Sequence, residues 1–258
     1  MTDGEVLLGH FSDKLAECAD ENRITCTGFL DASQRSEAMR FCAARKARHV
    51  FFGGYEDAER TVCAFLPDYF DEADFPLYFL ENEDDSPVVA VRCEYPKDAP
   101  ALTHRDFLGS LMALGIKRET VGDILVSERS ADVFVLPQIA EYLSRDFSRA
   151  GRVSVNVTKI SLRDVRVPPQ RTESHRDTVA SMRLDAVVSA VFSLSRGKAE
   201  EAIVAGLVFC NDVRSFKTDA KVSEGDKIVL RGSGKARITS VGGFSKKGRT
   251  VILFDKYL

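Results

Sequence analysis

The sequence lacks the patterns that define several large classes of protein. Its six cysteines include no Cys-x-x-Cys pair, so no zinc site is expected, and we interpret the thiols as buried or incidental. No apolar run is long enough to cross a bilayer. The opening residues, MTDGEVLLGHF, have no cationic start followed by an apolar run, so no signal peptide is predicted. We therefore expect a cytoplasmic, reducing location and no membrane partner.

Signatures of catalysis are also missing. Gly53-Gly54 is not part of a Gly-x-x-x-x-Gly-Lys-Ser/Thr loop, and we find no methyl-donor glycine motif and no His-Ile-Gly-His-like signature. His104-Arg105-Asp106 resembles part of a kinase catalytic loop, but no Asp-Phe-Gly accompanies it. The acidic stretch 68–85 could hold a metal through carboxylates, although such charge runs are typical of solvated loops. We predict no catalytic residue, no cofactor and no metal.

Charge is divided unevenly along the chain. Residues 171–258 contain 16 Lys+Arg and 10 Asp+Glu, which gives a net charge of +6. Residues 1–170 contain 20 Lys+Arg and 29 Asp+Glu, which gives a net charge of −9. The basic carboxyl-terminal part has the charge expected of a region that binds nucleic acid. The acidic part is typical of a solubilising surface.

The hydrophobic pattern predicts an α+β protein with three regions. Residues 1–87 form a mixed helix and strand region, with a helix over 32–46 capped by Asp31 and strands at 49–52 and 61–66. Residues 88–167 alternate in the order β-α-β-β-α-β, the ferredoxin-like arrangement shared with RNA-recognition modules. The last strand is predicted at 153–162, and its residues 153–157 include no aromatic residue for base stacking, so this fold alone does not indicate RNA. The polar residues 168–180 are predicted to be a linker before a domain at 181–258.

Two short helices are predicted in the basic part. Leu184, Val187, Val188 and Val191 fall on one helical face. Ser195 is a good N-cap for a second helix, and Gly206 suits its termination. The second helix starts with two cations, which oppose the helix dipole but form an anion site together with the free amides. These cations are Arg196 and Lys198.

This part resembles the S-four (S4) domain, an RNA-binding module named after ribosomal small-subunit protein four. The matching residues are Arg183-Leu184-Asp185, Ser195-Arg196, Ala199, Ile203, Gly206, Val208, Asn211 and Glu224-Gly225-Asp226 before a strand at Lys227. The sequence departs from the family pattern at Glu200, where a basic residue is common, and at Asn211-Asp212, where the family has Asn-Gly. The RNA-binding residues predicted here are Arg183, Ser195, Arg196, Lys198, Lys217 and Lys235. An ion pair between Arg183 and Asp185 on the surface is the structural alternative.

Six further residues are candidates for secondary RNA contacts. They are His104, Arg105, Lys117, Arg118, Lys246 and Lys247. Each also has a structural interpretation. Thr103 and Asp106 form a variant of the capping box, which explains the motif around His104 without any contact role. Cations at helix ends and hairpin tips are often only solvated.

The chain as a whole resembles the YlmH family of bacterial proteins. The resemblance rests on FFGGYEDAER (51–60), HRDFLGSLMALGIKRETVGDI (104–124) and TVASMRLD (178–185). It implies a cytoplasmic RNA-binding protein, which we expect to be monomeric and without catalysis. The implied partners are rRNA of the large ribosomal subunit and peptidyl-tRNA, in ribosome-associated quality control.

Two other classes of function stay open from the sequence alone. One is an RNA-modifying enzyme, such as a pseudouridine synthase or methyltransferase, with an S-four accessory domain. The other is a protein-interaction scaffold that uses the acidic amino-terminal region.

Overall fold

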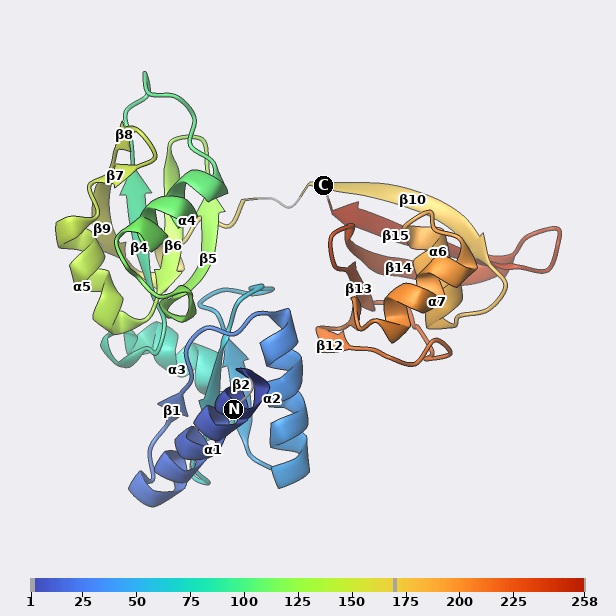
Figure 1. Ribbon diagram of the computed structural model, residues 1–258, viewed down its shortest axis with the longest axis horizontal. Coiled ribbons are helices and arrows are strands. Elements are labelled where there is room, and N and C mark those ends of the chain that lie inside the picture. Colours follow the sequence, from blue (N-terminus) through green and yellow to red (C-terminus); the bar gives the residue numbers. More distant parts are fainter. Residues whose placement is uncertain (1–2, 169–170, 258) are drawn as a thin grey trace. The chain divides into compact units, whose positions relative to one another are not determined.

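The described residues form two compact units. The computed structural model describes residues 3–168 and 171–257, and each range belongs to one unit (Figure 1). Both units combine helices with antiparallel sheets, so the predicted α+β class is confirmed. None of the described helices is long and apolar enough to cross a membrane. The regions predicted at 1–87 and 88–167 contribute their described residues to one and the same unit.

The amino-terminal part of the first unit is a three-stranded sheet in the order β1-β3-β2, with two helices packed on one face. Its elements are α1 (Asp3–Glu21), β1 (Thr25–Cys26), α2 (Ala32–Arg45), β2 (His49–Phe52), β3 (Val62–Phe65), α3 (Phe75–Glu81) and the short η1 (Glu83–Asp85). The Gln34 backbone amide donates to the Asp31 carboxylate at 2.8 Å, and the Asp31 backbone amide donates to the side-chain oxygen of Gln34 at 2.9 Å. This capping box confirms the predicted start of α2.

The central part of the first unit is a four-stranded sheet in the order β5-β6-β4-β9. Its elements are β4 (Val89–Glu94), α4 (His104–Ala113), η2 (Arg118–Thr120), β5 (Val121–Val126), β6 (Ser130–Val135), α5 (Pro137–Asp146), β7 (Arg149–Ala150), β8 (Val153–Ser154), β9 (Asn156–Ile160) and η3 (Leu162–Asp164). The main elements follow the predicted β-α-β-β-α-β order. The strand predicted at 153–162 is divided, because residues 149–154 form a separate small hairpin.

Both faces of the central sheet are buried. Val91 and Val133 pack in one apolar cluster with Phe107 of α4 and Leu143 of α5. The alternate strand residue Phe134 points to the opposite face, because successive side chains of a strand alternate. There it packs with Ala90, Phe29, Phe52, Val62, Phe75 and Phe79. The amino-terminal part therefore covers the sheet face that an isolated ferredoxin-like domain would expose.

Polar contacts fix the same junction. The Tyr55 hydroxyl and the Glu59 amide donate to Oδ2 of Asp123, at 2.8 and 2.7 Å, and the Arg60 amide donates to Oδ1 at 3.2 Å. Burial of Asp123 raises the pKa of its carboxyl, although these donors act in the opposite direction. Gly54, at φ +93°, approaches the Phe134 ring so closely that a Cβ would lie 2.6 Å from it.

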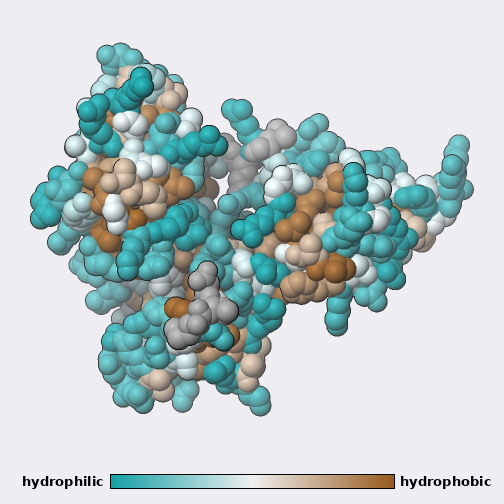
Figure 2. Space-filling view, in the orientation of Figure 1, coloured by the Kyte–Doolittle hydropathy of each residue, from teal (hydrophilic) through white to brown (hydrophobic). Residues whose placement is uncertain are grey.

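The second unit is a six-stranded sheet in the order β10-β15-β14-β13-β11-β12, with two helices on one face. Its elements are β10 (Thr172–Val179), α6 (Leu184–Val191), α7 (Arg196–Val204), β11 (Val208–Cys210), β12 (Val213–Arg214), β13 (Lys227–Leu230), β14 (Gly234–Phe244) and β15 (Thr250–Tyr257). Figure 2 shows a largely hydrophilic visible surface, with apolar residues gathered over α7 and β12 of this unit. Val204, Leu207 and Val213 are exposed in that part of the sequence.

The linker predicted at 168–180 is wrong over 172–179. These residues form β10, which pairs antiparallel with β15 along its whole length, from Thr172 opposite Tyr257 to Val179 opposite Thr250. The strand lies at an edge of the sheet, where polar side chains can face solvent and do not reveal a strand by hydrophobicity. Residues 169–170 of the predicted linker lie outside the described residues.

Candidate nucleic-acid interface

Helices α6 and α7 form where the sequence predicted them. The apolar face of α6 is buried through Leu184, Val187 and Val191. The Ser195 hydroxyl accepts from the Lys198 amide at 3.3 Å, so Ser195 is the N-cap of α7 as predicted. Gly206 follows α7 in the left-handed region at φ +70°, which also agrees with the prediction.

Asp185 is the residue that organises the junction between the two helices. Its side chain is fully buried, and it receives guanidinium groups from two directions. The Arg183 Nη2 donates to Oδ2 at 3.1 Å, and the Arg196 Nη2 donates to the same oxygen at 2.8 Å. The Ala186 amide donates to Oδ1 at 2.7 Å. One carboxylate therefore holds two arginines that are 13 positions apart, numbered 183 and 196.

These contacts decide the ionisation of Asp185. Burial works to raise the pKa of the carboxyl, but the hydrogen bonds from Arg183, Arg196 and Ala186 outweigh it, so the pKa lies below its ordinary value. Asp185 is ionised at neutral pH. The same contact raises the pKa of the Arg183 guanidinium. The sequence interpretation allowed for an Arg183–Asp185 ion pair but missed Arg196 as the second partner of Asp185.

The two arginines remain accessible from solvent. Their side chains are 44% exposed for Arg183 and 54% exposed for Arg196. A guanidinium has five N–H donors, so a contact with Asp185 leaves donors for a phosphate. Lys198 is exposed in the first turn of α7. Glu200, at the position where the S-four family commonly has a basic residue, lies 3.5 Å from the Arg196 Nε and reduces the local positive charge.

Lys217 is placed near the two arginines by backbone hydrogen bonds of the residues that follow it. The Asp185 amide donates to the Thr218 carbonyl at 2.9 Å, and the Leu184 amide donates to the Ala220 carbonyl at 2.8 Å. The segment after Lys217 is thereby fixed against the start of α6. We refer to Arg183, Ser195, Arg196, Lys198 and Lys217 as the helix ridge.

Lys235 lies on the other side of the sheet and does not belong to the helix ridge. Its neighbours in β14, Ala236 and Ile238, are fully buried against the helices. Side chains alternate along a strand, so Lys235 points to the opposite face. There its ammonium lies 4.8 Å from the centroid of the Tyr257 ring. The role of Lys235 as an RNA-binding residue therefore stays a prediction, at a place separate from the helix ridge.

The candidate secondary contacts are dispersed. His104 and Arg105 are exposed in the first turn of α4, where Thr103 and Asp106 form the predicted capping box. Arg118 is half-buried, its guanidinium donates to the Val121 carbonyl, and burial lowers its pKa to about 10. Lys117 is 78% exposed beside Glu119. Lys246 and Lys247 are exposed in the turn between β14 and β15.

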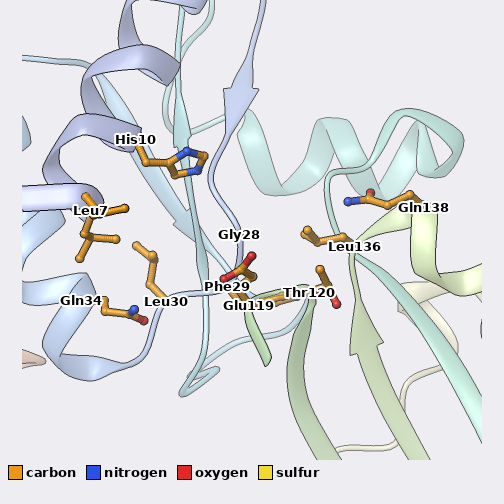
Figure 3. A pocket seen from close by; sticks show the side chains of 11 residues that line it. Leu7, His10, Gly28, Phe29, Leu30, Gln34, Glu119, Thr120, Leu136 and Gln138 are labelled. Carbon is orange, nitrogen blue, oxygen red and sulfur yellow. The ribbon is translucent and has the colours of Figure 1, made fainter. Parts of the chain in front are cut away.

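The first unit also contains a cavity of about 480 Å³, shown in Figure 3. Leu7, Phe29 and Leu136 give it an apolar lining, and His10 and Gln138 contribute polar groups. Among its described lining residues there is none of the predicted RNA-binding residues. Within residues 3–168 and 171–257, no group of three or more His, Cys, Asp or Glu is placed to hold a metal ion. The six cysteines are free thiols.

Comparisons with known proteins agree with this organisation. Residues 82–164 match the family described as "Putative RNA-binding domain in YlmH", and residues 182–228 match the S4 domain. The chain is 30% identical over 239 residues to the ribosome-associated protein quality control protein P2 of Bacillus subtilis (strain 168). That similarity covers 92% of this chain and 89% of the relative. The chain belongs to the YlmH family. It thus carries domains of RNA-binding families.

A solved YlmH structure shows a related fold. It is the cell division protein ylmH from Streptococcus pneumoniae, with a TM-score of 0.50 and 20% sequence identity. The similarity covers 65% of this chain and 96% of that chain. In this YlmH-family chain, the S4 match begins at Met182, immediately before Arg183, and includes both arginines held by Asp185.

Proposed function

We propose that this chain is a non-catalytic RNA-binding protein that acts on the large ribosomal subunit in ribosome-associated quality control. The observation that carries the proposal is the anchoring of Arg183 and Arg196 on the buried Asp185. This contact presents two partly exposed guanidinium groups side by side at the junction of α6 and α7. Arginine recognises phosphate through paired N–H donors, so the pair suits a phosphate backbone.

The proposed mechanism relies on shape and charge. Arg183, Arg196 and Lys198 bind phosphates, and Lys217 binds a further phosphate of the same backbone. Ser195 and the nearby backbone amides form hydrogen bonds with the phosphates. Such contacts position RNA without reading base edges, so the fold of the RNA supplies the selectivity. The similarity to the ribosome-associated protein quality control protein P2 of Bacillus subtilis supports the assignment to ribosome-associated quality control. We infer rRNA, with peptidyl-tRNA beside it, as the RNA that is bound.

The central domain would contribute RNA contacts through its helices and loops and not through its sheet. Both faces of that sheet are filled by apolar side chains. The base-stacking platform of RNA-recognition modules is therefore covered in this fold. His104 and Arg105 on α4, together with Lys117, stay as candidates for such a contact.

The test is RNA binding by the full chain and by a variant in which Arg183, Arg196 and Lys198 are all changed to Gln. Affinity for large-subunit rRNA fragments is measured at two salt concentrations, with Arg145→Gln as a matched control, because Arg145 is 77% exposed in the first unit. We expect the triple variant to lose binding and to show a salt dependence weaker by about one logarithmic unit per lost contact. Unchanged affinity and slope would contradict the proposal.

Further measurements identify the RNA that is bound and test whether the chain is instead an RNA-modifying enzyme. Crosslinking in cells followed by sequencing identifies the attached RNA, and sedimentation with isolated subunits distinguishes the large from the small. Nucleoside composition of the RNA after incubation, with and without a methyl donor, should not change. A new modified nucleoside would replace the proposal with that of a modifying enzyme.

A further inference from the structure

The second unit has a cationic surface on the sheet face opposite its helices. The pairing register of the strands and the alternation of side chains along each strand define this surface. Ala236, Ile238, Ile228 and Ile252 are buried against α6 and α7. The residues between them in the strands point outward. We call this surface the outer sheet face, and its charged or aromatic members on β10, β13, β14 and β15 include Arg176, Lys227, Lys235, Arg237, Asp255 and Tyr257.

Cross-strand pairing arranges these residues in two rows. In one row Arg237 of β14 lies opposite Lys227 of β13 and opposite Asp255 of β15. In the other row Lys235 lies opposite Val229 and next to Tyr257. Directly paired residues of antiparallel strands share a face and have adjacent side chains. Lys227, Lys235 and Arg237 therefore lie side by side on β13 and β14, with Asp255 and Tyr257 of β15 next to them.

Two carboxylates, Asp212 and Asp255, lie at this surface, and Asp255 is directly opposite Arg237. Asp255 accepts from the Ser174 hydroxyl at 2.6 Å. Asp212 lies 2.9 Å from the Lys227 ammonium. Arg176, Lys235 and Arg237 add three further positive charges, so the surface has a clear excess of positive charge. Arg176 is exposed beside the exposed Leu253, which is opposite it on β15.

Tyr257 gives the surface an aromatic centre. The Lys235 ammonium lies 4.8 Å from the ring centroid, and the Arg237 Nε donates to the Tyr257 hydroxyl at 3.4 Å. A cation above a tyrosine ring is held by the ring's negative face. The tyrosine thus contacts two of the cations. Sheet faces that combine cations with an aromatic ring suit single-stranded nucleic acid, because phosphates contact the cations and a base contacts the ring.

We propose that the outer sheet face is a second RNA-binding surface, which takes the backbone of a single-stranded RNA segment. The inference rests on the proposed function, in that both surfaces bind RNA. Because α6 and α7 cover the opposite side of the sheet, one compact RNA helix cannot touch the helix ridge and the outer sheet face together. The second unit therefore holds two RNA segments, one on each side of its sheet.

The test is the stoichiometry of complexes between the full chain, a large-subunit rRNA fragment for the helix ridge, and a single-stranded RNA of about 12 nucleotides for the outer sheet face, a length within the usual site sizes. Native mass spectrometry counts the RNA molecules per chain. We expect two for the unmodified chain, one for the double variant Lys235→Gln with Arg237→Gln, and one for Arg183→Gln with Arg196→Gln. For the outer sheet variant, the logarithmic salt slope should fall by about 1.4, since each single-strand contact contributes roughly 0.7.

The outcomes separate this inference from the proposed function. One RNA per chain, lost only in the helix-ridge variant, overturns the second surface and leaves the proposed function intact. That result would also be expected if the outer sheet face bound a protein instead. Loss of RNA only in the outer sheet variant overturns the role of the helix ridge. If neither variant affects RNA, both proposals fail.

Two further measurements guard against misfolding of the double variant. Arg176→Gln changes an exposed residue at the edge of the surface and should also weaken binding of the second RNA, by a few-fold. Ultraviolet crosslinking of the unmodified chain should join RNA to peptides containing Tyr257 as well as to those containing Arg196. Crosslinks confined to the Arg196 peptide would contradict the second surface.

Discussion

The Arg196 Nη2 lies 2.8 Å from the Oδ2 of the buried Asp185. A carboxylate buried at the start of a helix thus determines where a guanidinium from the next helix stands. Burial of a charge is costly unless it is paired and hydrogen-bonded, so the pairing has consequences for stability as well as for RNA. The first predictions concern this relationship.

Changing Asp185 to Asn should destabilise the second unit. An amide keeps one acceptor but loses the charge that strengthens the bonds from Arg183 and Arg196. The free energy of unfolding should fall by about 1.5–3 kcal/mol, the range for hydrogen bonds to a charged group. Hydrogen exchange of the α6 and α7 amides measures this locally. Asp219→Asn, an exposed acid in the adjacent segment, is the control and should change protection little.

The contribution of Asp185 should depend on pH with a definite sign. Its folded-state pKa lies below the ordinary 3.8, so the folded protein binds fewer protons than the unfolded chain near that value. The stabilisation is complete above pH 3.8 and is lost as the pH falls through the folded-state pKa. Urea unfolding of the unmodified chain and of Asp185→Asn should converge at acid pH. A gap that widens on acidification would show that the pKa is raised instead.

Local features of this site could be predicted from the sequence, and the non-local ones could not. The N-cap at Ser195 and the glycine after α7 depend on neighbouring residues and were predicted correctly. The contact of Asp185 with Arg196 depends on how two helices pack, which no spacing rule gives. Lys235 is an intermediate case. Its alternation with the buried Ala236 and Ile238 was visible in the sequence and would have placed it on the other face.

The fold shows the same division. The order of elements in the central part followed from hydrophobic periodicity. The packing of Phe29 and Phe52 against Phe134 did not, because it joins segments that are far apart in sequence. Strand β10 was missed for a different reason. Its residues, TESHRDTV, are mostly polar, and their strand conformation comes from pairing with β15.

The contact between Gly54 and Phe134 should make Gly54→Ala strongly destabilising. The new Cβ would lie 2.6 Å from a fully buried ring, and the backbone is at φ +93°. Overpacking and left-handed strain together should reduce the free energy of unfolding by roughly 2–5 kcal/mol. Gly109→Ala is the matched control, because a Cβ there meets nothing within 4 Å in helix α4. It should stabilise by up to about 1 kcal/mol. If Gly54→Ala and Gly109→Ala changed the thermal unfolding equally, that result would contradict the close contact between Gly54 and Phe134.

Arg118 should behave as a structural residue, unlike its neighbour Lys117. The Arg118 guanidinium donates to the Val121 and Gly122 carbonyls, whereas Lys117 is largely solvated. Arg118→Gln should lower the free energy of unfolding by about 1–3 kcal/mol, and Lys117→Gln should change it by less than about 0.5 kcal/mol. Thermal unfolding measures both. A loss of RNA affinity in Arg118→Gln at unchanged stability would instead assign Arg118 to the RNA contact.

Replacing both arginines of the ridge by lysine separates geometry from charge. Arg183→Lys with Arg196→Lys keeps every positive charge, so counterion release and the salt slope should be unchanged. Lysine cannot reproduce the fork that contacts Asp185 on one side and a phosphate on the other. RNA affinity should therefore fall several-fold at every salt concentration. Lys198→Arg also keeps its charge, at an exposed position, and should bind like the unmodified chain. If the double lysine variant keeps full affinity, the anchoring by Asp185 serves stability alone, and positive charge without fixed geometry is sufficient for the RNA.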